Sequence, residues 1–317
     1  MTYHQLTSAD RYTISALKME GFNCAQIATH LGRHRSTVCR ELERNRCSHD
    51  GGYRPSKAHS RTATRRSISR RNVQFTAQDF DTVNSLLKQY WSPEQIAGHL
   101  ARTNQLQISH ETIYKYIWED RRNFGDLHTF LRGGRKQRRK RYGRYDSRGK
   151  LADKRHISER PASVETRNTK GHWEIDTVMG KGDKHCIVSI VERKTGYLVV
   201  GKLPCRTTEA LNKRVVQLIT QHPTAFKTIT SDNGTEFHGY KQIEEATGVP
   251  FYFATPHHSW ERGTNENTNG LIRQYLPKGS SMAQLTQHQC NAIAKKLNDR
   301  PRKRLQYKTP QECFYGL

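Results

Sequence analysis

The chain has 317 residues, 33% of them hydrophobic, and a formal net charge of +25. No segment approaches the roughly 18 consecutive apolar residues of a membrane span, the first residues lack a secretory signal pattern, and the seven cysteines show no paired spacing. These features exclude a membrane protein and argue against a disulfide framework. They favour a cytoplasmic protein of two or three domains whose partner is a polyanion.

Residues 1–50 are predicted to form a helix-turn-helix domain. Apolar residues recur at helical spacing up to Met19, a short helix over 24–31 ends at Gly32, and a further helix follows over 36–42. This spacing is typical of helix-turn-helix proteins. The side chains at the start and outer face of the last helix are the candidate DNA contacts: Arg33, Arg35, Ser36, Thr37 and Arg40.

Residues 51–75 are interpreted as a basic linker, because seven basic residues and no acid lie between Arg54 and Arg71. A second helix-turn-helix domain is predicted at 76–131. Ser92 and Pro93 begin one helix, Ser109 caps the next, and Ala97, Ile113 and Ile117 are expected in its core. Its candidate DNA contacts are Ser109, His110, Thr112 and Lys115. A helical hairpin that contacts nothing is the alternative for either domain.

Residues 132–165 are interpreted as a second basic linker. Ten basic residues and a single acid, Asp146, lie between Arg132 and Lys150, with several glycines and no apolar periodicity. Contact with DNA phosphates is one interpretation and a solvated tether is the other. Under the first interpretation the phosphate contacts include Arg135, Arg138 and Arg139.

From residue 166 to 317 the pattern changes to strands alternating with helices. Strands are predicted at 173–178, 186–191 and 197–201 as an antiparallel meander, then at 226–231 and 249–254. Helices are predicted at 207–221, 235–247, 262–276 and 283–299. This order is that of an RNase H-like α/β domain, so the fold class is multidomain, with α-helical helix-turn-helix modules before an α/β catalytic domain.

Three carboxylates can converge in such a fold. Asp176 lies on the first strand, Asp232 ends the fourth, and Glu266 follows 34 positions later on a helix. Oxygen ligands of this kind suit two Mg²⁺ or Mn²⁺ ions that promote in-line displacement at phosphorus. Glu174, Asn269 and Arg273 are candidate accessory residues.

Other interpretations stay open for single residues. Asp232-Asn233-Gly234 is also a strong turn signal, and Glu174 could be merely exposed. Trp260 either stacks on a nucleotide or packs its loop against the core, and Lys278 is a further candidate DNA contact. No histidine stands with cysteines at zinc spacing, which argues against structural zinc.

The blocks 171–176, 230–237 and 259–279, with shorter blocks at 92–97, 109–114, 298–303 and 307–310, resemble the insertion-sequence-30 family of DDE transposases. The resemblance covers nearly the whole chain. It implies an RNase H-like core, divalent metal dependence, binding to the terminal inverted repeats of the element, and Asp176, Asp232 and Glu266 as the metal-binding triad.

The sequence therefore predicts a nucleoid-associated DNA transposase that cuts a strand with water and joins the freed 3′-hydroxyl to another strand. Because two element ends and a target DNA must be held together, a homodimer or larger synaptic assembly is expected. The alternatives are a non-catalytic regulator derived from a transposase, and a nuclease that cuts without joining.

Overall fold

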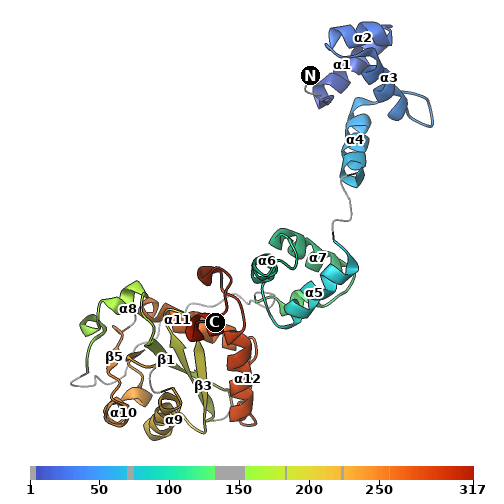
Figure 1. Cartoon of the computed structure of the whole chain (residues 1–317). Coiled ribbons are helices and arrows are strands. Elements are labelled where there is room, and N and C mark those ends of the chain that lie inside the picture. The colour runs from blue at the N-terminus through green and yellow to red at the C-terminus, as the bar shows by residue number, and fades with distance from the viewer. Residues whose placement is uncertain (1–4, 70–74, 133–153, 183, 223–224, 257) are drawn as a thin grey trace. The chain divides into compact units, whose positions relative to one another are not determined.

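The structure is a computed structural model that describes residues 5–69, 75–132, 154–182, 184–222, 225–256 and 258–317 (Figure 1). The chain divides into two compact units, Met1–Ala77 and Gln78–Leu317. Over the described ranges, the structure contains no helix with the length and apolar character needed to cross a bilayer.

The first unit contains four helices: α1 (Ser8–Met19), α2 (Cys24–His30), α3 (Arg35–Arg44) and α4 (Pro55–Ser69). Thr7 with Asp10, and Asn23 with Gln26, form capping boxes that begin α1 and α2. The apolar core consists of Leu6, Ile14, Ile27, Ala28 and Val38. The predicted order of helices over 6–45 is therefore present.

Helix α4 corrects the interpretation of 51–75 as a linker. Residues 55–69 form a helix that packs against α1, with Ala58 fully buried. Arg11 on α1 lies 3.5 Å from both His59 Nδ1 and Thr62 Oγ1 of α4. The sequence pattern did not indicate this helix, because its contacts with α1 come from alanine, histidine and threonine rather than from an apolar stripe.

In the second unit, α5 (Ala77–Lys88), α6 (Pro93–Arg102) and α7 (His110–Arg122) form a helical module, followed by η1 (Leu127–Phe130). Ser92 and Gln95 form the predicted N-terminal cap of α6. Ile113 and Ile117 are fully buried as expected, whereas Ala97 is only half-buried. Ile96, one position earlier on α6, takes the core position instead.

The rest of the unit is built on a five-stranded sheet of order β3-β2-β1-β4-β5. The strands are β1 (His172–Met179), β2 (Cys186–Glu192), β3 (Leu198–Leu203), β4 (Thr228–Ser231) and β5 (Phe251–Phe253). The first three pair antiparallel, and β4 lies parallel to β1 and β5. This topology confirms the predicted RNase H-like α/β fold and its meander.

Helices cover both faces of the sheet. The helices α9 (Thr208–Thr220) and α10 (Tyr240–Thr247) share one apolar core with the sheet, and α11 (Gly263–Ile272) and α12 (Gln287–Asn298) share the other. Figure 1 shows α9 and α12 on either side of β3. The helices α11 and α12 are shorter than predicted, because a capping box at Thr286 begins α12 only at Gln287 and Arg273 ends α11.

Short elements complete the unit: α8 (Ser163–Thr166), α13 (Pro310–Tyr315) and the 3-10 turns η2 (Ile157–Glu159), η3 (Thr235–Phe237), η4 (Ser259–Arg262) and η5 (Lys303–Leu305). His156 forms a bridge with Phe253 of β5. Residues 154–165 thus pack onto the sheet instead of belonging to a linker, which corrects the end of the predicted 132–165 segment. Most of that segment, 133–153, lies outside the described residues.

Candidate active site

Asp176 and Asp232 lie at the same level of two adjacent strands. Glu174 of β1 pairs with Thr230 of the parallel strand β4, and each aspartate follows two residues later. Because side chains alternate along a strand, this register places both carboxylates together where β4 ends. Gly234 N donates to Asp232 Oδ1 at 2.9 Å, so the predicted Asp-Asn-Gly turn also holds the aspartate side chain.

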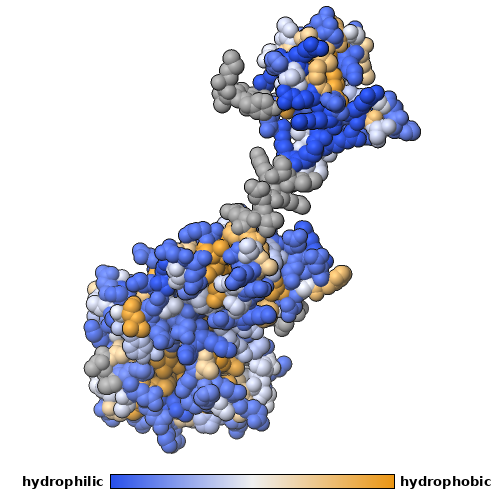
Figure 2. Space-filling view, turned by 45° about the vertical axis from the view of Figure 1, so that its right-hand side comes forward, coloured by the Kyte–Doolittle hydropathy of each residue, from blue (hydrophilic) through white to orange (hydrophobic). Residues whose placement is uncertain are grey.

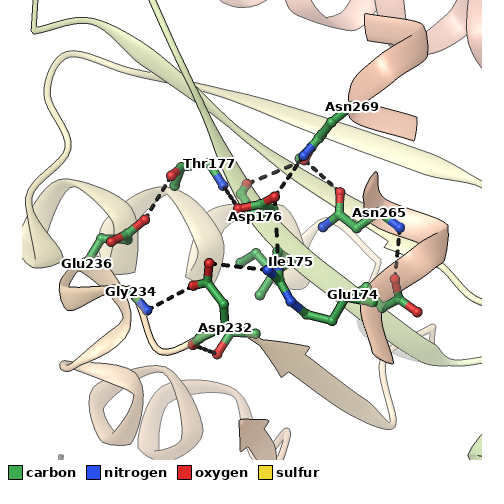
Figure 3. Close-up of polar contacts among 12 residues, drawn as sticks. Glu174, Ile175, Asp176, Thr177, Asp232, Gly234, Glu236, Asn265 and Asn269 are labelled. Atoms are coloured by element: carbon green, nitrogen blue, oxygen red, sulfur yellow. Dashed lines mark hydrogen bonds and ion pairs between the residues drawn. The ribbon is translucent and has the colours of Figure 1, made fainter. Parts of the chain in front are cut away.

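Arg262 joins the two aspartates, which Figure 3 shows near each other. Its guanidinium Nη2 lies 3.2 Å from Asp232 Oδ2 and its Nη1 lies 3.9 Å from Asp176 Oδ2. Nη1 also donates to the carbonyl oxygen of Ile175 at 3.1 Å. Both carboxylates therefore face one cationic group, which comes from η4, directly before α11.

Asp176 is held away from water. Burial raises the pKa of its carboxyl to about 6, with Asp232 and Glu236 adding to the effect and Arg262 opposing it. Thr177 N donates to Oδ1 at 2.8 Å, and Asn269 Nδ2 donates to Oδ2 at 2.9 Å. The side chain is thus fixed at both oxygens, and an added cation would relieve the cost of its ionisation.

A buried polar ladder fixes α11 on the sheet. Glu174 Oε2 accepts from Asn265 N at 2.8 Å, one helical turn before Asn269 meets Asp176. The hydroxyl of Ser189, opposite Asp176 on β2, lies 3.1 Å from Asn265 Oδ1 and 2.7 Å from Asn269 Oδ1. Glu174 and Asp176 are two residues apart on β1, and their partners Asn265 and Asn269 are four residues apart on α11. Both spacings are about 6–7 Å, so each strand residue lies beside its partner on the helix.

Glu174 is fully buried, so the interpretation of it as merely exposed is wrong. Its Oε1 accepts from Arg193 Nη1 at 2.8 Å. Because its two oxygens hold Arg193 and the first turn of α11, Glu174 acts as an anchor for the helix that carries Glu266.

Glu236 is a further acid that the sequence reasoning missed. It is buried, and its Oε1 accepts from Thr177 Oγ1 at 2.8 Å and from Arg206 Nη2 at 2.6 Å. Its Oε2 is buried without a hydrogen-bond partner. The block at 230–237 that carries the family resemblance contains Glu236. A single sequence does not indicate that this side chain forms a hydrogen bond with Thr177 of β1. Arg262 was missed for the same reason.

The other predicted residues of α11 lie apart from the two aspartates. Glu266 is exposed, and no hydrogen bond or ion pair joins it to the described residues. Because Asn269 lies three residues later, the two share a helix face. Arg273, a candidate accessory residue, donates from its Nη2 to the carbonyl oxygen of Met179 at 2.9 Å. Arg273 directly follows α11, and its side chain reaches the end of β1.

The site fits a divalent cation in part. No three His, Cys, Asp or Glu side chains among the described residues are grouped closely enough to hold a metal. However, Asp176 and Asp232 already present oxygens to the Arg262 guanidinium, which stands where a cation is needed. Glu266, three residues before Asn269 on α11, is the carboxylate that the sequence analysis predicts as a third oxygen ligand.

The candidate DNA contacts lie on exposed helix starts. His34 caps α3, Arg35 and Arg40 are exposed, and Arg40 Nη2 donates to Ser36 Oγ at 2.7 Å. Ser109 caps α7, and His110, Lys115 and Lys278 are exposed. Figure 2 shows hydrophilic residues over most of the visible surface of both units. Three predicted contacts lie outside the described residues: Arg135, Arg138 and Arg139.

Trp260 does not pack its loop against the core, so that alternative is wrong. Its side chain is 69% exposed, and its ring stacks on His258 with the centroids 4.3 Å apart. Because the Trp260 ring is exposed, stacking of this ring on a nucleotide stays a proposal.

Comparison with known proteins adds to this geometry. A helix-turn-helix domain family matches residues 2–45. The chain is 40% identical to the transposase for insertion sequence element IS4351 of Bacteroides fragilis, over 98% of this chain and 95% of that protein. It is 38% identical to the transposase for insertion sequence element IS1086 of Cupriavidus metallidurans, over 98% and 94%.

It is also 36% identical to transposase InsI for insertion sequence element IS30A of Escherichia coli, over 98% of this chain and 83% of that protein. Among solved structures, the catalytic core domain of BIV integrase is similar with a TM-score of 0.37 and 19% identity, over 47% of this chain and 95% of that one.

Proposed function

Because the chain belongs to the insertion-sequence-30 family of transposases, we propose that it cuts and joins DNA strands at a site built on Asp176, Asp232 and Glu266. The observation that carries this proposal is the pairing of Asp176 with Asp232 across β1 and β4, both facing one cation. The family membership favours a transposase over a non-catalytic regulator.

In the proposed site, Asp176 and Asp232 would hold divalent metal ions, with Glu266 as the further oxygen ligand. Such ions, when bound, activate a water or a hydroxyl and stabilise the leaving oxygen at phosphorus. Asn269 and Thr177 keep the Asp176 oxygens in place, and Glu174 holds α11 through Asn265. Arg262 gives up its place between the aspartates and is then free to bind a phosphate oxygen.

The reaction takes two steps. In the first, a water oxygen bonds to phosphorus at the element end, the bond to the 3′-oxygen breaks, and that oxygen leaves as a 3′-hydroxyl. In the second, this hydroxyl bonds to the phosphorus of another strand and displaces a 3′-oxygen there. No protein nucleophile is needed, since neither step leaves DNA attached to the chain.

DNA recognition falls to the helical modules in this proposal. The starts of α3 and α7 contact the terminal inverted repeats, and two or more copies of the chain hold the two ends and the target. The exposed basic and hydroxyl side chains at these helix starts support it.

The test is cleavage and joining of labelled DNA that carries the element's terminal repeats, with Mg²⁺, Mn²⁺ or EDTA. Asp232→Asn should lose both reactions while binding to the repeats persists, because only the charge is removed. Glu209→Gln, an exposed carboxylate in the first turn of α9, serves as the control and should keep both reactions. Repeat-specific binding without cleavage under any metal would contradict the proposal, and cleavage without joining would indicate a nuclease.

A further inference from the structure

The helix α11 borders a groove that is distinct from the two aspartates. Two cavities of about 190 and 240 Å³ share four lining residues, Asn267, Leu271, Arg302 and Arg304, and so adjoin each other. We call this space the α11 groove. It lies within the second unit, between α11 and the segment that follows α12.

Arginines without carboxylate partners line the groove. Arg167, Arg302 and Arg304 line the smaller cavity, and the larger one is lined by Arg302 and Arg304 together with Arg132, Arg300 and Lys303. Of these six, only Lys303 forms an ion pair within the described part of the chain, at 2.6 Å from Glu94.

The arginines instead donate to neutral oxygens. Arg302 Nη2 donates to the carbonyl oxygen of Leu297 at 3.0 Å, and Arg304 Nη1 donates to that of Lys194 at 2.5 Å. Arg300 donates to the side-chain oxygens of Gln95 and Gln274. These bonds hold the guanidinium groups in place but leave their charges unbalanced.

Burial and neighbouring positive charges lower the pKa values of two of these arginines. Burial, followed by repulsion from Arg300 and Arg304, lowers the pKa of Arg302 to about 9. Burial likewise lowers the pKa of Arg300 to about 10. A bound anion would reverse both effects, because it supplies the negative charge that these side chains lack.

Neutral donors are also available at the groove. Thr264 Oγ1 is buried without a hydrogen-bond partner and lines the smaller cavity. The helix α11 begins there, and its N-cap residue Arg262 supplies no side-chain cap. Two N–H groups of the first turn are already bonded, because Gly263 N donates to the carbonyl oxygen of Trp260 and Asn265 N donates to Glu174 Oε2. The positive end of the helix dipole still favours an anion beside Thr264.

We propose that the α11 groove binds a backbone phosphate of duplex DNA, held by Arg302 and Arg304 with Thr264 at the start of α11. This inference rests on the proposed function. Because Glu266, Asn265 and Asn269 belong to the same helix, a phosphate bound here fixes α11 relative to the DNA. The groove thus acts as a second anchor that positions the carboxylates without contacting the scissile bond.

The test measures the affinity of the full chain for duplex DNA carrying the terminal repeats, by fluorescence anisotropy over a range of KCl concentrations. Arg302→Gln with Arg304→Gln should weaken binding about tenfold or more. The slope of log affinity against log salt should become shallower by about 2, one for each lost phosphate contact. Arg304→Gln alone, at an exposed side chain, should lower the slope by about 1 and guards against misfolding of the double variant.

The matched control is Lys213→Gln with Lys241→Gln, which removes two exposed charges from α9 and α10 on the other face of the sheet. It should keep the wild-type slope. Replacing single phosphates by methylphosphonates gives a second readout: wild type should lose affinity at a position where Arg304→Gln does not.

The outcomes separate the two proposals. If the wild-type chain cuts the repeat DNA and the groove variants match the control in slope and methylphosphonate sensitivity, the groove inference is overturned and the transposase proposal stands. If the wild-type chain neither binds nor cuts this DNA, both are overturned. A groove variant that still folds but loses one phosphate contact supports the inference.

Discussion

Ionisation of Asp176 is unfavourable in its surroundings, so this residue of the candidate active site lowers the stability of the fold at neutral pH. The pKa of its carboxyl is about 6 in the fold and about 3.9 in an unfolded chain. The folded state therefore binds this proton more tightly, and the contribution of Asp176 to the free energy of unfolding is greatest below pH 4 and falls as the pH rises from 4 to 6. The difference corresponds to about 3 kcal/mol at pH 7.

Asp176→Asn should remove this penalty. In metal-free buffer at pH 8 we expect the variant to be more stable than wild type by about 1–2 kcal/mol, after the loss of one hydrogen bond worth about 1 kcal/mol. The advantage should disappear near pH 4. Thermal unfolding with EDTA between pH 4 and 8 measures both effects, with Glu209→Gln as the control. Parallel pH profiles for Asp176→Asn and wild type would contradict the pKa assignment.

Arg262 stands between the aspartates as their counterion, and under the proposed function a metal ion would take its place. Arg262→Gln leaves both carboxylates facing each other, so the metal-free variant should be less stable than wild type at pH 7. Added Mg²⁺ should then raise the melting temperature of the variant more than that of wild type. Arg155→Gln, at the exposed pair with Glu244, is the control and should respond to Mg²⁺ as wild type does. An equal response in Arg262→Gln would mean that Arg262 does not compete with the metal.

At the scale of elements, the match between α11 and the sheet depends on one hydroxyl. Ser189 is fully buried and contacts the amide oxygens of both Asn265 and Asn269. Ser189→Ala should lower the free energy of unfolding by about 1–3 kcal/mol, because a buried amide oxygen loses the single hydroxyl hydrogen that Ser189 donates. Cleavage should slow as well, since Asn269 holds Asp176.

Urea unfolding and the cleavage rate on repeat DNA test this effect together. Thr220→Ala, which removes a hydroxyl from the exposed end of α9, should change neither quantity. If the Ser189→Ala variant is destabilised but cuts DNA at the wild-type rate, the hydrogen bonds of Ser189 contribute to stability and not to catalysis.

The sequence predicted the elements better than the contacts between them. Runs of β-branched residues located β1, β2 and β3, and capping residues such as Ser92 and Ser109 located the starts of α6 and α7. The sequence did not reveal α4, because a helix rich in basic and small residues lacks an apolar stripe. Arg262 and Glu236 were missed because their partners lie 30 or more residues away, and local spacing carries no information about such pairs.

At the scale of the whole molecule, the charge is shared by two units that each have their own core. Residues 1–77 carry fourteen basic and five acidic side chains. The core of Leu6, Ile14, Ile27, Ala28 and Val38 lies entirely within this unit, as does the buried pair of Arg11 with Glu41 at 2.7 Å. The first unit should therefore fold and bind DNA without the rest of the chain.

The sharpest test of that independence compares two fragments. A fragment of residues 1–77 should unfold cooperatively and bind DNA with a steep salt dependence. A fragment of residues 1–50 should be much less stable, because it lacks α4 and exposes the Arg11–Glu41 pair that His59 and Thr62 help to cover. Circular dichroism melts and anisotropy measure both. Equal stability of the two fragments would restore the linker interpretation of 51–75, whereas loss of folding only in the shorter one would make α4 part of the DNA-binding domain.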